Sequence, residues 1–224
     1  MSCNRLPHLA IPVVTALGIV CVLLPGLTSA RTTQQEPDGL YCLRGVMTDL
    51  LRKADQGDKD AQFVIASMYG AGHCLRQDAE KRWKWLQKAA DQNHAEALFE
   101  VATAYYLGDG LKQDKAHAGR LYQRAAKLGH AGSQHQLGLM MLRNRDRTED
   151  EKYEGLYWLG TSATNGNALS AMLVAYMHER GMMGVSADKC LAWDWYEASF
   201  LLGMQDAMRH MNRLEKSGVC ADGR

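Results

Sequence analysis

The amino-acid sequence repeats itself with a fixed spacing of 36 residues. The stretch GHCLRQDAEKRWKWLQKAADQNHAEAL, residues 72–98, is matched by GDGLKQDKAHAGRLYQRAAKLGHAGSQ, residues 108–134. A fixed period of roughly 20 to 50 residues is typical of solenoids, in which each unit buries its apolar face against the next unit. The repeat therefore predicts a stacked array instead of one globular core.

Each repeat is predicted to hold two helices joined by a glycine turn. One face of the first helix carries an apolar or small residue at every fourth position: Ala61, Ile65 and Tyr69; Ala97, Val101 and Tyr105; Ser133, Leu137 and Met141. Gly70-Ala71-Gly72 and Gly108-Asp109-Gly110 follow two of these helices, because glycine permits the left-handed backbone that ends a helix. Asp78, Asp114 and Asp188 stand where a carboxylate caps the next helix.

The second helix of each repeat is predicted to carry a large apolar pair and then a small pair. The large pairs are Trp85-Leu86, Leu121-Tyr122, Tyr157-Trp158 and Trp195-Tyr196, and the small pairs are Ala89-Ala90, Ala125-Ala126, Ser162-Ala163 and Ala198-Ser199. Four helical hairpins are therefore expected over residues 58–203. Residues 31–57 are expected to hold a linker and a capping helix from Leu43 to Gln56. Residues 204–224 are expected to hold a closing helix from Met204 to Lys216 and a tail, since the end repeats of an array need a polar outer face.

The pattern A-x-x-x-L-x-x-x-Y, G-x-G, D, then W/Y and an alanine pair before G-x-A resembles the Sel-like repeat family, which is related to tetratricopeptide repeats. YYLGDGLKQDKAHAGRLYQRAAKLGHA, residues 105–131, carries the resemblance most clearly, while RNRDRTEDEKYEG, residues 143–155, departs from it by lacking the G-x-G turn. The resemblance implies an all-α, right-handed α-solenoid of about four helical hairpins with capping helices. It also implies that the first helices line a concave surface and that the chain holds other proteins.

The first 30 residues are typical of a secretory signal peptide. They contain one Arg, no acidic residue, an apolar run over residues 11–24 and the ending Thr28-Ser29-Ala30. Pro12 and Pro25 bound a stretch shorter than the roughly 20 apolar residues of a spanning helix, so cleavage after Ala30 is favoured over an uncleaved anchor. The mature chain is expected to be soluble in the periplasm, with no membrane insertion after cleavage.

The charge balance narrows the classes of partner that the chain is expected to bind. Beyond residue 30 the chain carries 25 Lys and Arg against 25 Asp and Glu, which gives no electrostatic reason to expect a nucleic acid or an anionic membrane as partner.

The chain beyond residue 30 contains an even number of cysteines, which predicts disulfides in an exported chain: Cys42, Cys74, Cys190 and Cys220. Of three connectivities, Cys42 with Cys74 and Cys190 with Cys220 is favoured, because only neighbouring repeats touch in a solenoid; four free thiols are the alternative.

Residues that would indicate catalysis or metal binding are sparse. The sequence offers no G-x-S-x-G elbow and no phosphate-cradling glycine loop. His94 and His130 occupy equivalent places that Asn167 fills in the last repeat, which favours helix capping over metal binding. His73 beside Cys74 lacks the spacing of a zinc site. We therefore expect a chain with no catalytic, metal or cofactor site.

A partner is expected to bind where the repeats differ from one another. The third, seventh and tenth places of the first helices form one stripe: Phe63, Ser67 and Gly70; Phe99, Thr103 and Tyr106; His135, Leu139 and Leu142. Phe99 with Tyr106 would supply an aromatic anchor of the kind that dominates protein interfaces. The alternative is that Phe63 and Phe99 belong to the core.

Two tryptophans stand off the aromatic place that the repeats share. They are Trp83 and Trp193, and the corresponding places in the other two repeats are predicted to be Gly119 and Gly155. Both tryptophans lie about 200° around the helix from the shared aromatic place. They are either exposed anchors for a partner or residues that close the ends of the array against the capping helices.

Three functions follow from resemblance. Small exported Sel-like repeat proteins resemble immunity proteins that neutralise type VI secreted phospholipase effectors in the periplasm. GHCLRQD, GLKQDK and EGLYWLGTSAT loosely resemble the flagellar motor protein MotX, which would make the chain a scaffold of an envelope or motor assembly. A β-lactam-binding or hydrolysing enzyme is a third alternative, which the absence of S-x-x-K disfavours. The leading hypothesis is a non-catalytic periplasmic protein that binds another protein.

Overall fold

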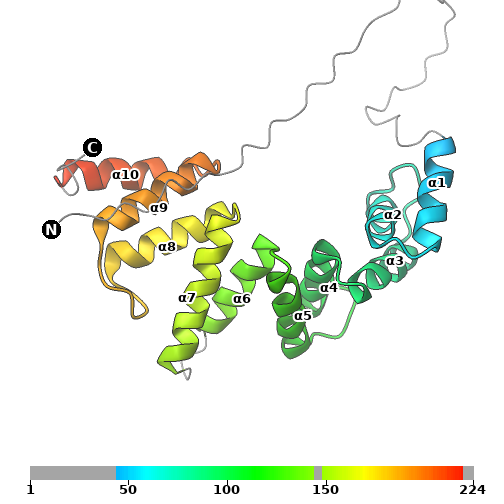
Figure 1. Cartoon of the computed structure of the whole chain (residues 1–224), viewed down its shortest axis with the longest axis horizontal. Helices are drawn as coiled ribbons and strands as arrows, with labels where there is room; N and C mark the ends of the chain where they lie inside the picture. Colours follow the sequence, from blue (N-terminus) through cyan, green and yellow to red (C-terminus); the bar gives the residue numbers. More distant parts are fainter. Residues whose placement is uncertain (1–43, 144–147, 219–224) are drawn as a thin grey trace, which may run out of the picture.

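The computed structural model describes residues 44–143 and 148–218, and over these ranges it contains ten α-helices and no strand. The helices are α1 (Arg44–Asp55), α2 (Lys59–Ala71), α3 (Ala79–Asp91), α4 (Ala95–Leu107), α5 (Lys115–Lys127), α6 (Ala131–Arg143), α7 (Glu149–Thr164), α8 (Ala168–Arg180), α9 (Lys189–Leu201) and α10 (Ala207–Lys216). They follow one another along a curved path, with α1 and α10 at opposite ends (Figure 1). The predicted all-α array of helical hairpins is confirmed.

The predicted turns and caps set the ends of these helices. Three first helices end at a glycine with left-handed backbone, whose N–H donates to the carbonyl four residues earlier: Gly72, Gly108 and Gly181. Three second helices begin after an aspartate whose carboxylate accepts backbone N–H groups of the first turn: Asp78, Asp114 and Asp188. The local signals that repeat along the sequence therefore fix where each hairpin turns.

The second helix of repeat three corrects the predicted register. The pair Tyr157-Trp158 was expected at the packing place, but Tyr157 is 64% exposed and Leu159 is fully buried. Leu159 lies 37 residues after the buried Tyr122, so this repeat has one residue more than the spacing of 36 allows. Each residue turns a helix by about 100°, and burial of Leu159 therefore carries Tyr157 to the surface. The packing pair is Trp158-Leu159.

Helices α6 and α7 cross closely at a glycine, which gives a stability prediction. A Cβ at Gly138 would lie 2.8 Å from the carbonyl oxygen of Gly155 and 2.8 Å from Cγ of Leu159. We expect Gly138→Ala to lower the free energy of unfolding by about 1–3 kcal/mol, because the α7 backbone must move. Gly160→Ala is the matched control, since a Cβ there meets nothing within 4 Å, and helix propensity should raise stability by up to about 1 kcal/mol. Urea unfolding followed by circular dichroism measures both, and a loss of equal size would contradict the close crossing.

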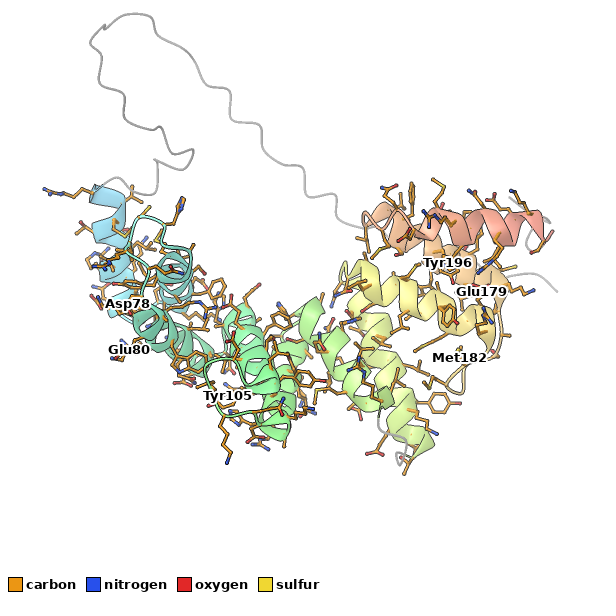
Figure 2. All side chains as sticks on the ribbon, turned by 180° about the vertical axis from the view of Figure 1, so that it is seen from behind. Asp78, Glu80, Tyr105, Glu179, Met182 and Tyr196 are labelled. Atoms are coloured by element: carbon orange, nitrogen blue, oxygen red, sulfur yellow. The ribbon has the colours of Figure 1, made fainter. Side chains whose placement is uncertain are left out.

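A buried carboxylate closes the C-terminal end of the array. The side chain of Glu179 is 10% exposed and accepts hydrogen bonds from the Tyr196 hydroxyl at 2.7 Å and from Arg213 at 2.6 and 2.7 Å. Figure 2 shows Glu179 and Tyr196 at this end of the array. Burial, followed by the hydrogen bond to Glu179, raises the pKa of the Tyr196 phenol, so that it stays a donor. Apolar residues of α10 complete the closure: Ala207, Met211 and Leu214.

Within residues 44–143 and 148–218, no helix is both long enough and apolar enough to cross a membrane.

Candidate protein-binding surface

The predicted aromatic stripe is largely used for packing between repeats. Phe63 stacks on His94 with ring centroids 4.4 Å apart, and Phe99 packs on His130 at 4.6 Å. Both phenylalanines are half-buried against the core of the first two repeats. The stripe therefore joins consecutive hairpins, and the core interpretation of Phe63 and Phe99 is favoured over a free anchor.

The histidines and the asparagine at the equivalent places cap helices, as predicted. Nδ1 of His94 accepts the N–H of Ala97 at 3.2 Å, and Nδ1 of His130 accepts the N–H of Ser133 at 3.0 Å. Oδ1 of Asn167 accepts the corresponding N–H of Ser170 at 2.9 Å. The shared role explains why one place accepts either side chain.

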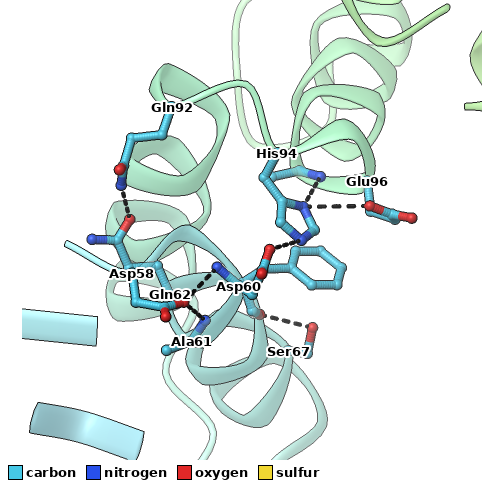
Figure 3. Close-up of polar contacts among 10 residues, drawn as sticks. Asp58, Asp60, Ala61, Gln62, Ser67, Gln92, His94 and Glu96 are labelled. Carbon is cyan, nitrogen blue, oxygen red and sulfur yellow. Dashed lines mark hydrogen bonds and ion pairs between the residues drawn. The ribbon is translucent and has the colours of Figure 1, made fainter. Parts of the chain in front are cut away.

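Carboxylates surround the His94 cap (Figure 3). Nε2 of His94 lies 3.5 Å from Asp60, and Nδ1 lies 3.5 Å from Glu96. To the left of this group, Gln92 donates from Nε2 to Oε1 of Gln62 at 2.8 Å, as the same view shows. These contacts join α2, α3 and α4 at the boundary between repeats one and two, so the surface near α3 rests on a fixed scaffold.

Capping by His130 predicts that acid weakens the array. Burial lowers the pKa of His130, with Glu96 opposing this, so the folded chain favours the neutral ring. The stability that depends on this neutral ring is present above the unfolded-state pKa of about 6.5 and is lost as the pH falls through the lowered folded-state pKa. His130→Asn copies the Asn167 cap without titrating. Urea unfolding at neutral pH and at about pH 5 should show a smaller acid loss for this variant, and an equal loss would contradict the role of His130.

Tyr106 and Phe99 meet around a buried tyrosine. Tyr122 is 1% exposed, and its ring lies 5.8 Å from that of Phe99 and 6.4 Å from that of Tyr106. Its hydroxyl is hydrogen-bonded to Thr103 at 3.0 Å. The structure therefore brings the predicted pair together, as part of the packing of repeat two.

Both unusual tryptophans are half-buried against a core cluster, at opposite ends of the array. Trp193 packs against an apolar cluster to which α10 contributes three residues, which favours the interpretation that it closes the C-terminal end. Trp83 is half-buried on α3 beside the core of the first two repeats. The register correction also changes the residue of repeat three that is equivalent to these tryptophans: it is Leu156 and not Gly155. The hollow beside Trp83 makes it the stronger candidate for contact with a partner.

A hollow of about 430 Å³ surrounds Trp83 on α3. Its lining is aromatic with a basic rim: Lys81, Trp83, Lys84, Trp85, Gln87, Lys88 and Asp91. Nζ of Lys88 lies 4.1 Å from the centre of the Trp85 ring, so this cation covers one indole face. Large aromatic side chains with a partly exposed surface are the residues that contribute most to protein interfaces. The hollow suits an apolar or aromatic side chain flanked by acidic groups.

A second hollow, of about 490 Å³, lies between α2, α3 and α4. It is lined by Ser67, Gly70, Ala71, Arg82 and Glu100, of which Ser67 and Gly70 belong to the predicted stripe. Arg82 donates to Glu100 at 2.6 Å. A Cβ at Gly70 would lie 2.7 Å from Cδ of Arg82, so glycine makes room for this ion pair. Both hollows include residues of α3, which makes repeat one the candidate binding region.

The sequence reasoning missed the basic rim and the ion pair. Lys81, Lys84 and Lys88 recur at helical spacing on α3, a signal that was available in the sequence. The pairing of Arg82 with Glu100 joins residues 18 apart and had no local signal.

The cysteines and the expected lack of metal are only partly covered by the structure. Cys74 and Cys190 are disulfide-bonded, while Cys42 and Cys220 lie outside the described residues, so the favoured pairing stays a prediction. Within residues 44–143 and 148–218, no group of three or more His, Cys, Asp or Glu is placed to hold a metal ion.

The repeats match a known family along most of the array. The Sel1 repeat matches residues 59–94, 95–130, 131–167 and 168–204. The chain belongs to the Sel1 repeat family. The four Sel1 repeats coincide with the hairpins α2–α3, α4–α5, α6–α7 and α8–α9. Comparison with curated proteins found no match.

Comparison with solved structures found similar proteins, two of which share the Sel1 repeat fold. A Sel1 repeat protein from Oxalobacter formigenes is 29% identical with a TM-score of 0.67, over 75% of this chain and 48% of its own. The protective antigen c5321 of uropathogenic Escherichia coli, which displays the same fold, is 22% identical with a TM-score of 0.65, over 78% of this chain and 37% of its own. The immunity protein Pa5087 from Pseudomonas aeruginosa is 20% identical with a TM-score of 0.49, over 76% of this chain and 62% of its own. The chain thus spans about half or less of the length of the first two.

Proposed function

We propose that this Sel1 repeat protein is a non-catalytic adaptor that binds another protein through the α3 hollow. The observation that carries the proposal is the half-buried Trp83 in a hollow that three lysines border. A rigid array holds this surface in place, so a partner would bind without the cost of ordering it. Sel1 repeats generally serve as scaffolds for protein interaction, which supports the same conclusion.

The finer proposal is an exported immunity protein that neutralises a secreted phospholipase or toxin in the periplasm. Its support is the signal-like composition of the first 30 residues, with an apolar run over residues 11–24 and the Thr28-Ser29-Ala30 ending. A fixed, partly apolar hollow also fits a tight stoichiometric complex, because preorganised surfaces lose little entropy on binding. The location and the effector class are the parts that need direct tests.

Affinity capture from periplasmic extract under non-reducing conditions tests the adaptor role. The full chain and the Trp83→Ala variant are used as paired baits, and proteins enriched by the first but not the second are identified by mass spectrometry. A secreted lipase or toxin would support the immunity proposal. Envelope-ring or motor components would favour a scaffold instead, and equal capture by both baits would argue against the α3 hollow.

A deletion strain tests the immunity role separately. When it is grown beside siblings that deliver effectors, it should lose viability, and expression of the chain with its first 30 residues should restore protection. Expression of residues 31–224 without an export signal should not restore it. Normal survival of the deletion strain would contradict the immunity proposal.

A further inference from the structure

One face of α7 presents two carboxylates and two tyrosines to solvent. Asp150, Tyr153, Glu154 and Tyr157 are spaced three, four and seven residues apart, which places them on the same side of the helix. Tyr153 is 58% exposed and Tyr157 is 64% exposed, among the most exposed large hydrophobic residues of the described part of the chain. Glu154 is held in position, since it accepts from Nε1 of Trp158 at 3.3 Å. We call these four residues the α7 face.

The equivalent positions of the other repeats carry different residues. With the corrected register, Tyr153 and Tyr157 correspond to Glu80 and Lys84 of repeat one, which form an ion pair at 2.6 Å. In repeats two and four the same places hold Ala116 with Arg120 and Cys190 with Asp194. Packing of a hairpin in this array therefore does not require tyrosine there. The Tyr157 ring lies edge-on to Trp158 with ring centroids 5.5 Å apart, but both tyrosine rings are more than half exposed and can serve a contact outside the chain.

The carboxylates of the α7 face and the acidic excess of the two repeats around it favour one kind of partner. Repeats three and four together carry 6 Lys and Arg against 9 Asp and Glu, whereas repeats one and two carry 11 against 8. The α7 face thus lies in the acidic half of the array, and its own ionisable groups other than tyrosine are two carboxylates. A cationic group is complementary to it, and an acidic group would be repelled.

We propose that the α7 face binds an arginine-bearing segment of a partner protein. A guanidinium stacks on a tyrosine ring and donates two parallel hydrogen bonds to a carboxylate, and the α7 face alternates these two kinds of group along one helix. The inference rests on the proposed protein-binding function and adds the chemistry of a second contact. In this arrangement the α3 hollow receives an apolar or acidic part of the partner and the α7 face receives a basic part.

Titration of the full chain with a short peptide of alternating arginine and serine tests this proposal. Backbone amide and tyrosine ring signals are followed by NMR, with the glutamate–serine peptide of the same length as the probe of opposite charge. We expect saturable shifts confined to α7 with the arginine peptide, weakened by added salt, and no shifts there with the glutamate peptide. Shifts elsewhere only, or equal binding of both peptides, would overturn the proposal.

Repeat one supplies the matched variant. Tyr153→Glu with Tyr157→Lys copies the Glu80–Lys84 pair, leaves the net charge unchanged and keeps helix-compatible residues. Loss of two ring contacts should weaken binding of the arginine peptide roughly five- to thirtyfold, while Glu80→Gln with Lys84→Gln should not change it. Undiminished binding to the tyrosine variant would overturn the proposal. Trp83→Ala should bind the peptide normally, so failure of the α3 hollow and failure of the α7 face are distinguishable.

Discussion

Leu159→Ala is expected to lower the free energy of unfolding by about 2–5 kcal/mol, because it removes a fully buried side chain from the contact between α6, α7 and α8. Tyr157→Ala is the matched comparison two residues earlier on the same helix. Its ring is 64% exposed, so the change should stay within about 0.5 kcal/mol. The difference between the two variants reports the register of α7.

Chemical denaturation at neutral pH measures both variants, with the slope of the transition as a check that each unfolds in the same way. Under the register in which Tyr157 packs inside the array, the order would be reversed and Tyr157→Ala would be the damaging change. Equal losses would also contradict the structure. The test matters for function, because the same register carries Tyr153 and Tyr157 to the surface.

The hairpins and their caps could be predicted because their signals are local. Gly108 ends one helix through its left-handed backbone, and Asp114 begins the next through its side chain, within a few residues of each other. The capping role of His130 was also predictable, since Asn167 fills the same slot with the same chemistry. Such signals repeat every 36 residues or so and reinforce one another.

The exposure of aromatic residues could not be predicted, because it depends on contacts between repeats. Phe63 stacks on His94, a residue 31 positions later, and no local sequence pattern predicts this contact. Trp193 packs against a cluster that includes residues of the closing helix α10, which also come later in the sequence. The shift that exposes Tyr157 arises from one additional residue in a stretch that departs from the repeat. Only the burial of Leu159 shows that this additional residue lies before the packing pair of α7. Of the proposed partner-binding residues, Trp83 lines one of the two hollows described above.

Trp83→Ala is expected to weaken binding of a captured partner by about thirtyfold or more, which is the usual effect of truncating a central aromatic residue of an interface. The loss of unfolding free energy should be smaller than for a fully buried side chain such as Leu159, because the Trp83 ring is only half-buried and lines a surface hollow. Trp193→Ala is the matched control, since it truncates the same kind of side chain in the last repeat, where it packs against the α10 cluster. That variant should lose stability and keep the affinity of the folded chain.

Isothermal titration of the full chain with the purified partner, compared with Trp83→Ala and Trp193→Ala, tests the central claim most directly. Thermal unfolding of each variant shows that the chain is folded at the temperature of the titration. The account predicts a stoichiometric complex whose affinity falls sharply in Trp83→Ala and is retained in Trp193→Ala. Unchanged affinity of a folded Trp83→Ala chain would contradict the claim that this Sel1 repeat protein binds its partner through the α3 hollow.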